Sequence, residues 1–473
     1  MRSLAPQRHR GRRWLRDVLV AGAWACLLSS AFAQVPELST SQLPEPTVPA
    51  GTILTFFRHP DETKYWVSGQ MNFIVQYHPP FYAAYSGANS LQPQSEEANS
   101  HVLTLYTGYE FTPSIEGIVD IEQVGGFGFS ETHGVAGFPN LDSVRQPYLG
   151  PQPYLARAFY HQVFAFSSEK VSTNRGPLSL FTTLPARRLE IRVGKFSLVD
   201  FFDINGVNGD SHLQFLNWAV DQNAGYDFAA DPRGYTWGVI LEYQCKKWGL
   251  RFGEALMPQG DGLEWNLRKA NTSNFEFELH RGFLRKKDGI IRAMAYINNG
   301  NMGIYQYANE QYLAGQVVPP SLSAHPEWVT SKYGFEVNFE QALGGSVLVG
   351  GRFGWNNGKT ETWSFTEADQ TIAVGMGFIG NLWKRNYDRA GVAIFTNGIT
   401  SEHARYLSYG GLGLVLGDGG LSYGRETGIA SYYTAHIWRG LYAGPDLQFI
   451  VNPGYNTVRG PVFVPSFRLH LEL

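Results

Sequence analysis

Apolar and polar residues alternate in short segments that recur from Trp66 to the last residue of this 473-residue chain. In segment 66–78, one face holds Val67, Met71, Phe73, Val75 and Tyr77, and the other holds Ser68, Gln70, Asn72 and Gln76. Successive side chains of a β-strand point to opposite sides, so a period of two indicates strands with one apolar and one polar face. The sequence therefore predicts an all-β fold.

Further alternating segments help to decide between a soluble β-sandwich and a membrane barrel. They are 103–111, 335–340, 347–356, 466–473 and 235–243, where Tyr235, Trp237, Val239, Leu241 and Tyr243 oppose Thr236 and Glu242. A soluble β-sandwich also alternates, with its apolar face inward. Here the polar faces carry charges in strand after strand, and the apolar faces are rich in the chain's 12 Trp, 25 Tyr and 31 Phe, as lipid-facing surfaces are. We therefore expect a transmembrane antiparallel β-barrel.

Connections between these segments alternate in length. Short turns are expected at 112–114, 246–247, 286–289, 343–345 and 439–440, and long connections at 79–100, 124–154, 197–233 and 299–330. Short periplasmic turns and long extracellular loops are typical of outer-membrane barrels. Thirteen strands between Tyr65 and Asn397 and three after Ala430 predict sixteen, with 401–407 as a helical turn. A further hairpin formed by 411–417 and 421–425 would make eighteen.

The N-terminus has the features of an export signal. Six Arg and an apolar stretch from Val18 to Leu28 precede the small-residue pattern Ala31-Phe32-Ala33, so we expect residues 1–33 to be a signal peptide. We expect 34–58 to be a Pro-containing periplasmic tail and 59–473 to be a single barrel domain. Removing residues 1–33 takes away six Arg and one Asp and changes the formal net charge from −3 to −8. This acidic balance is against a nucleic-acid partner.

Common catalytic and cofactor motifs are absent from the sequence. The GxGxxG letters at Gly375–Gly380 precede a turn rather than a helix, so strand glycines explain them better than a nucleotide site. Asp200, Asp203 and Asp210 leave calcium binding by an outer loop open, although an ordinary polar loop is the simpler interpretation. We expect no cofactor, no resident metal and no enzymatic activity.

The stretch 192–233 is the best candidate for a functional site. A strand places Glu190 and Arg192 on its polar face, and a long aromatic loop follows that is expected to fold into the pore. Aromatic rings with nearby donors and acceptors suit sugars, although the same rings could simply pack the loop against the wall. Candidates for the narrowest part of the pore, the eyelet, are Arg157, Glu190, Arg192, Lys195, Asn217, Trp218, Asp227, Arg233, Asp142 and Arg145.

Several motifs resemble one family, the OprB-type carbohydrate-selective porins. They are Ser68–Phe81, Tyr85–Leu91, Ala136–Arg145, Val193–Ser197, Gln214–Ala219, Tyr226-Asp227, Asp231–Tyr235 and Asp446–Asn456. The resemblance runs from about His59 to the C-terminus. It implies a sixteen-stranded outer-membrane barrel through which small sugars diffuse by way of a narrow, charged eyelet. The final Leu473 departs from the Phe that usually ends such barrels.

The leading hypothesis is thus a passive sugar channel in the outer membrane of a diderm bacterium. The alternatives are a general porin without sugar preference and a secreted all-β glycan-binding protein or glycosidase. Expected partners are small sugars, outer-membrane lipid and lipopolysaccharide, and the assembly machinery that binds the C-terminal strand. The sequence leaves monomer and homo-trimer open.

Overall fold

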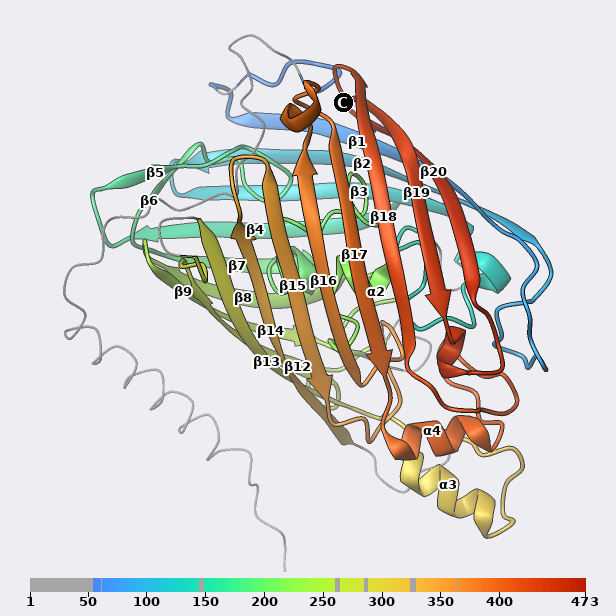
Figure 1. Ribbon diagram of the computed structural model, residues 1–473. Helices are drawn as coiled ribbons and strands as arrows, with labels where there is room; N and C mark the ends of the chain where they lie inside the picture. Colours follow the sequence, from blue (N-terminus) through green and yellow to red (C-terminus); the bar gives the residue numbers. More distant parts are fainter. Residues whose placement is uncertain are drawn as a thin grey trace, which may run out of the picture. The chain divides into compact units, whose positions relative to one another are not determined.

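The computed structural model describes residues 54–60, 62–143, 149–259, 264–284, 288–323, 329–363 and 365–473. Sixteen antiparallel strands form a closed barrel (Figure 1). They are β1 (Tyr65–His78), β2 (Glu96–Thr112), β3 (Ile115–Phe127), β4 (Tyr154–Ala165), β7 (Arg188–Phe196), β8 (Thr236–Gln244), β9 (Trp248–Leu256), β12 (Asn271–Leu279), β13 (Gly289–Gly300), β14 (Thr330–Ala342), β15 (Val347–Asn356), β16 (Gln370–Ile379), β17 (Arg389–Gly398), β18 (Glu426–Trp438), β19 (Leu441–Val451) and β20 (Val462–Glu472). The predicted number of strands is confirmed.

Pairing between the first and last strands closes the barrel. Strand β1 pairs with β20 from Gln70 opposite Glu472 to Gln76 opposite Ser466. Closure satisfies the backbone groups of both edges, which lipid could not do. The last residue contributes as well, because the Ser68 hydroxyl donates to its carbonyl at 2.8 Å.

The two faces of the wall follow the predicted alternation. On β8, Trp237, Val239 and Leu241 point outward and are exposed, while Thr236 and Glu242 are buried inside. Tyr235 does not follow this pattern, because the chain turns at Gly234, which has φ +94°, and β8 begins only after Tyr235. The Tyr235 side chain lies inside the barrel instead.

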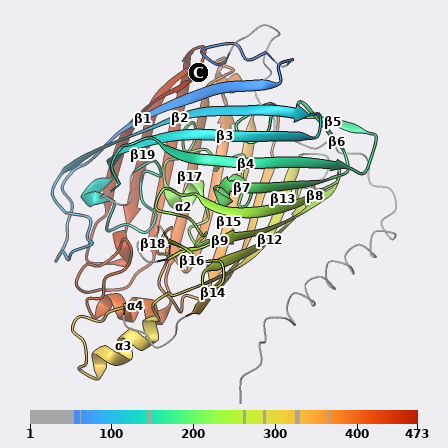
Figure 2. The ribbon, with the colours of Figure 1, turned by 180° about the vertical axis from the view of Figure 1, so that it is seen from behind.

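Short turns lie at one rim and long loops at the other, as predicted, except that residues 166–187 form a long connection between β4 and β7 at the rim of the short turns. Two residues join β18 to β19, whereas residues 399–425 join β17 to β18 and contain α4 (Ser401–Ser408). The helix α4 packs against α3 (Tyr305–Leu313) from the β13–β14 connection (Figure 2). The expected helical turn at 401–407 is therefore confirmed. Among the described helices, none combines the length and the apolar character that crossing a membrane would require.

A buried histidine joins three extracellular loops. The ring of His403 stacks on Tyr305 with centroids 4.1 Å apart, and its nitrogens lie 3.2 Å from Asp369 and 3.6 Å from Glu367. Burial by itself would lower the pKa of His403, but the two carboxylates outweigh burial and raise the pKa above its ordinary value. A charged His403 thus stabilises the contacts between these loops.

The connection from β7 to β8 folds into the barrel. We call residues 197–235 the inner loop; they include the short helix α2 (Trp218–Asp221). This loop reaches the far wall, where Asn205 bonds Asn338 at 2.9 Å and the carbonyl of Leu213 accepts from Thr434 at 2.9 Å. The predicted loop inside the pore is therefore present.

Candidate functional site

A run of alternating charges crosses the inner wall beneath the inner loop. His161 bridges Glu116 at 2.6 Å and Glu190 at 2.8 Å, and Arg192 bridges Glu190 at 2.6 Å and Glu242 at 2.9 Å. The pattern continues across neighbouring strands through Arg251 and Arg292. We call this set the charge ladder: Glu116, His161, Glu190, Arg192, Glu242, Arg251, Glu276, Glu278, Arg292 and Glu340.

The inner loop covers the charge ladder with aromatic rings. The Arg192 guanidinium lies 4.9 Å from the centroid of Phe201, and that of Arg251 lies 5.9 Å from Phe202. The backbone N–H of Asp203 donates to Glu276 at 3.2 Å. Because charge-assisted bonds and cation–π contacts strengthen when they are shielded from water, the ladder holds this part of the loop against the wall.

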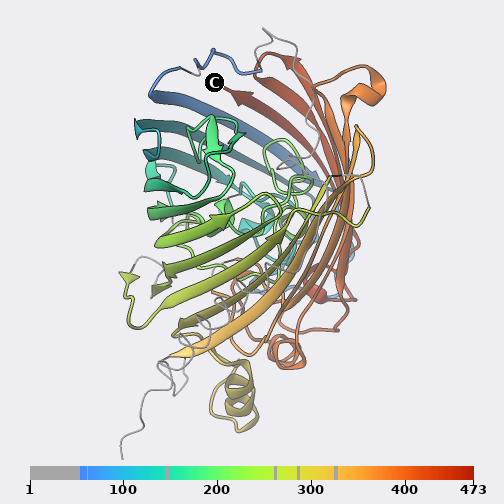
Figure 3. The same cartoon turned by 90° about the vertical axis from the view of Figure 1, so that its left-hand side faces the viewer.

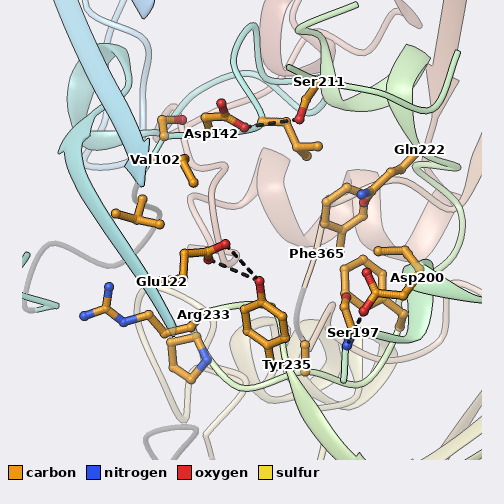
Figure 4. A pocket seen from close by; sticks show the side chains of 18 of the residues that line it. Val102, Glu122, Asp142, Ser197, Asp200, Ser211, Gln222, Arg233, Tyr235 and Phe365 are labelled. Carbon is orange, nitrogen blue, oxygen red and sulfur yellow. Dashed lines mark hydrogen bonds between the residues drawn. The ribbon is translucent and has the colours of Figure 1, made fainter. Parts of the chain in front are cut away.

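One cavity inside the barrel lies against β2, β3 and β4. A cavity of about 290 Å³ is lined on this wall by Val102, Glu122, Val124, Tyr154 and Arg157. Its other sides come from loops and include Asp142, Ser211, Trp218, Gln222, Arg233, Tyr235 and Phe365 (Figure 4). This cavity thus lies between the inner loop and one side of the barrel wall.

Arg157 carries most of the positive charge at this wall, and its charge is balanced. Its Nε and Nη2 donate to the two carboxylate oxygens of Asp200 at 2.7 and 2.6 Å, and Nη1 donates to Asp120 at 3.3 Å. A guanidinium has five N–H donors, so these three bonds leave two for other acceptors. Asp200 is itself fixed, because it also accepts from the backbone of Ser197 at 3.0 Å.

A second polar group surrounds Glu122. The Tyr235 hydroxyl lies 3.1 and 3.2 Å from the two Glu122 oxygens, and the Tyr154 hydroxyl donates to the same carboxylate. Arg233 stacks over the Tyr154 ring at 4.3 Å and donates to the carbonyl of Gly150 at 2.7 Å. These contacts fix the orientation of a carboxylate and a guanidinium at the cavity.

Several lining residues retain unused polar atoms. Within the described part of the chain, Trp218 Nε1, Gln222 Oε1 and Arg233 Nη1 have no hydrogen-bond partner. Trp218 stacks on Phe365 with centroids 5.2 Å apart and planes 7° apart, so one of its faces is already covered. These three atoms are themselves buried, so water in the cavity does not reach them.

Four predicted eyelet residues line the cavity: Asp142, Arg157, Trp218 and Arg233. Asp142 accepts from Asn72 at 2.5 Å and from Ser211 at 3.2 Å, which ties β1 to two loops. The predicted candidate Arg145 lies outside the described residues.

The other five predicted candidates lie beside the cavity rather than on it. Glu190 and Arg192 belong to the charge ladder, and Lys195 pairs with Asp231 at 3.2 Å. Asn217 caps α2 by accepting from Ala219 at 3.0 Å and also bonds Gln448 at 3.0 Å. Asp227 lies 3.4 Å from Lys332 and accepts from the backbone of Trp363. Arg192 and Lys195 contact the inner loop, Asn217 and Asp227 belong to it, and Glu190 bonds to Arg192 on the wall.

Sequence reasoning missed several lining residues. Glu122 and Asp200 were indistinguishable from the many other carboxylates of the chain, and Phe365 lies far away in sequence on a different loop. Gln222 directly follows α2 in the aromatic loop that was expected to fold into the pore. This position was the one sequence feature that could have indicated Gln222 as a lining residue. Asp200 and Asp203 were considered as calcium ligands, but they pair with Arg157 and Arg352. The described residues contain no group of three or more acidic, His or Cys side chains placed to hold a metal ion.

A closed sixteen-stranded barrel narrowed by an inward-folded loop defines an outer-membrane channel of the porin type. Residues 91–473 match the family model described as carbohydrate-selective porin, OprB family, so the chain belongs to this family. It is a passive channel for small carbohydrates in the outer membrane of Gram-negative bacteria, and both family and fold indicate a channel rather than an enzyme. The motifs at 68–81 lie before the matched region.

A solved structure agrees with this fold. A high-pH structure of Pseudomonas putida OprB is 14% identical, covers 87% of this chain and 94% of its own, and superimposes with a TM-score of 0.65. The outer-membrane channel DcaP of Acinetobacter baumannii is 7% identical, covers 89% and 100%, and has a TM-score of 0.49. No curated protein matches the sequence.

Proposed function

We propose that the cavity against β2–β4 is the eyelet through which small neutral sugars pass. The observation that carries this proposal is a set of charged and polar side chains around one opening, in which Arg157 is balanced by Asp120 and Asp200 and keeps two N–H donors. The balanced charge of Arg157 produces little net field, so ions gain little there, whereas its remaining donors replace part of a sugar's hydration shell. A volume of about 290 Å³ lies at the lower end for small-molecule sites, which suits monosaccharides better than longer chains.

Each lining group has a proposed role. Arg157 donates to sugar hydroxyls with its two remaining N–H groups, and the side-chain amide of Gln222, which lines the cavity, supplies a further hydrogen-bonding group. Trp218 and Phe365 supply the apolar side, against which the C–H faces of a sugar ring pack. Glu190, Arg192, Lys195, Asn217 and Asp227 act as positioning residues that fix the inner loop.

We also propose roles for the N-terminal segments, for the outer face of the barrel and for its last strand. Residues 1–33 act as the signal peptide and 34–58 as a periplasmic tail before the barrel domain 59–473. Outward apolar side chains contact lipid and lipopolysaccharide, and β20 is the strand that the assembly machinery recognises. We further propose that the protein has no enzymatic activity and that it works as a monomer or a homo-trimer, each barrel holding a complete eyelet.

Current block by sugar tests the eyelet. In planar bilayers, glucose added to the wild-type channel should produce concentration-dependent block, and Gln222→Ala should weaken this block by about two- to tenfold, as expected for the loss of one hydrogen bond worth about 0.5–1.5 kcal/mol. The matched control is Gln123→Ala on the outer face of β3, where the amide contacts His101 at 3.0 Å and cannot reach the cavity.

The control channel should keep the wild-type block. Equal block by glucose in both variants would show that sugars pass elsewhere. Equal permeation of neutral sugars and amino acids of similar size in liposome swelling would instead indicate a general porin.

A further inference from the structure

One periplasmic connection breaks the rule of short turns. Residues 166–187, which we call the periplasmic hairpin, join β4 to β7 and contain the paired strands β5 (Lys170–Ser172) and β6 (Thr183–Pro185). Figure 3 faces the rim that carries this hairpin and shows it at the mouth of the barrel. A two-residue turn would have been enough to join two antiparallel neighbours, so the additional chain requires an explanation.

The tip of the periplasmic hairpin is bonded to the inner wall. Glu116 of β3 accepts from the backbone N–H of Leu180 at 2.8 Å and from the Ser179 hydroxyl at 2.8 Å. A Cβ at Gly108 of β2 would lie 2.5 Å from a Leu180 methyl carbon, so the glycine makes room for this side chain. Glu116 also binds His161, which makes the hairpin tip an extension of the charge ladder.

The tip brings an apolar surface into the barrel. Leu180 is 1% exposed and belongs to the same packed cluster as Trp66 and Ile118, whose side chains point inward from β1 and β3. Leu178 lies against this cluster and is partly accessible. Leu180 is therefore covered by the wall, and Leu178 is the apolar side chain that the tip leaves accessible at the periplasmic end of the lumen.

This surface lies directly below the eyelet. On β3, Glu122 lines the cavity and Glu116 binds the hairpin; on β2, the corresponding residues are Val102 and Gly108. Six residues along a strand correspond to about 20 Å, measured toward the periplasm. A solute that leaves the cavity along this wall reaches the hairpin tip before it reaches the rim.

The hairpin is fixed at a second point, next to its turn. Arg175 donates to the carbonyls of Pro60 and Thr63, both at 2.8 Å, in the segment before β1. The hairpin is thus held at the wall by Glu116 and at the chain's entry into the barrel by Arg175. Anchors at both sides argue for a fixed structural element rather than a mobile turn.

We propose that the tip of the periplasmic hairpin, residues 178–181, forms a second, apolar constriction at the exit of the channel and limits the size of the sugars that pass. The proposal deepens the function proposed above, because it rests on sugars descending through the cavity. The polar eyelet selects for hydroxyl groups, and the apolar exit offers no bonds that would retain a sugar there. Weak binding at the exit favours release, which conduction requires.

Shortening the hairpin tests this inference. Residues 171–184 are replaced by Gly-Gly, and the folded channel is identified by its heat-modifiable mobility on gels. We expect single-channel conductance to rise by roughly twofold and the swelling rate with maltotriose, relative to glucose, to rise by a similar factor. Current block by glucose should stay at the wild-type level, because the cavity is untouched. Unchanged conductance and an unchanged maltotriose-to-glucose ratio would overturn the proposal.

A second measurement avoids any dependence on the deletion. In a Cys245→Ser background, Leu178→Cys is treated from the periplasmic side with a cationic methanethiosulfonate reagent, and the conductance should fall stepwise. Lys170→Cys at the exposed base of the hairpin is the matched control and should leave the conductance unchanged after modification. Equal responses at the two positions would place the tip outside the path. Failure of the eyelet itself would appear separately, as an unaltered glucose block in Gln222→Ala.

Discussion

Two arginines on neighbouring strands provide a sharp test of which charges form the path. Arg157 on β4 and Arg192 on β7 both point into the barrel, and each binds two carboxylates. Arg157 lines the cavity, whereas Arg192 is 7% exposed beneath Phe201. The same substitution to alanine should therefore have different consequences.

For Arg157→Ala we expect a change in transport. Two of its five N–H donors are free for a sugar, and a hydrogen bond to a charged group contributes about 1.5–3 kcal/mol, so glucose block should weaken by about tenfold or more. Asp120 and Asp200 lose their cation, so conductance should rise and the reversal potential in a salt gradient should shift toward cation selectivity.

For Arg192→Ala we expect a change in stability. Removing one partner of a buried ion pair costs about 3–5 kcal/mol, and the lower value applies because Glu190 keeps Arg188 and His161 and Glu242 keeps Arg251. Urea titration of the barrel folded into lipid vesicles measures this loss, and planar bilayers should show near wild-type conductance and glucose block. If Arg192→Ala altered conductance and block as strongly as Arg157→Ala, the separation between ladder and path would be refuted.

Three further predictions concern the wall, the terminus and the extracellular loops. Leu447→Arg, midway along β19 on the lipid face, should cost about 2–4 kcal/mol in urea titrations, while Val451→Arg at the end of the same strand should cost about 0–1. Leu473→Phe should raise or preserve the yield of folded barrel, whereas deleting Leu469–Leu473 should abolish it by opening the β1–β20 edge; normal folding of the truncated chain would contradict closure by this strand. The stabilisation of the loops by a charged His403 is complete below the ordinary pKa of histidine and is lost as the pH rises through the raised pKa. Tryptic cleavage of the loops, normalised to a peptide substrate, should therefore accelerate at alkaline pH. His403→Gln should remove this pH dependence.

The barrel was predictable because its determinants are local. Alternation along each strand reports which side faces lipid, and the difference between turns and loops leaves sixteen or eighteen strands. The interpretation of 401–407 as a helical turn favoured sixteen. Tyr235 shows the limit of this reasoning. Its place in the alternation of β8 predicts an outward side chain, but the turn at Gly234 directs the side chain inward. Alternation predicts the direction of a side chain only for residues that lie within the strand.

The eyelet was less predictable because the inner faces of the strands carry many more charges than the path uses. Arg157 and Arg192 look alike in sequence, and only the course of the inner loop separates them. That course depends on contacts such as Asn205 with Asn338 and Leu213 with Thr434, which join residues more than a hundred positions apart. Phe365 reaches the cavity from yet another loop. Such contacts have no periodic signature in a single sequence.

The abundance of charge inside this channel is compatible with a preference for neutral sugars because most of the charge is used internally. A narrow opening discriminates between solutes only if its walls stay in place, and a loop of this length needs strong anchors to remain fixed. The charge ladder supplies those anchors, since each cation lies between two carboxylates, and Arg192 and Arg251 are also shielded by rings of the inner loop. The same pairing cancels the field that unpaired charges would impose on the lumen. Fixing the loop and leaving the path nearly neutral are thus two consequences of one arrangement.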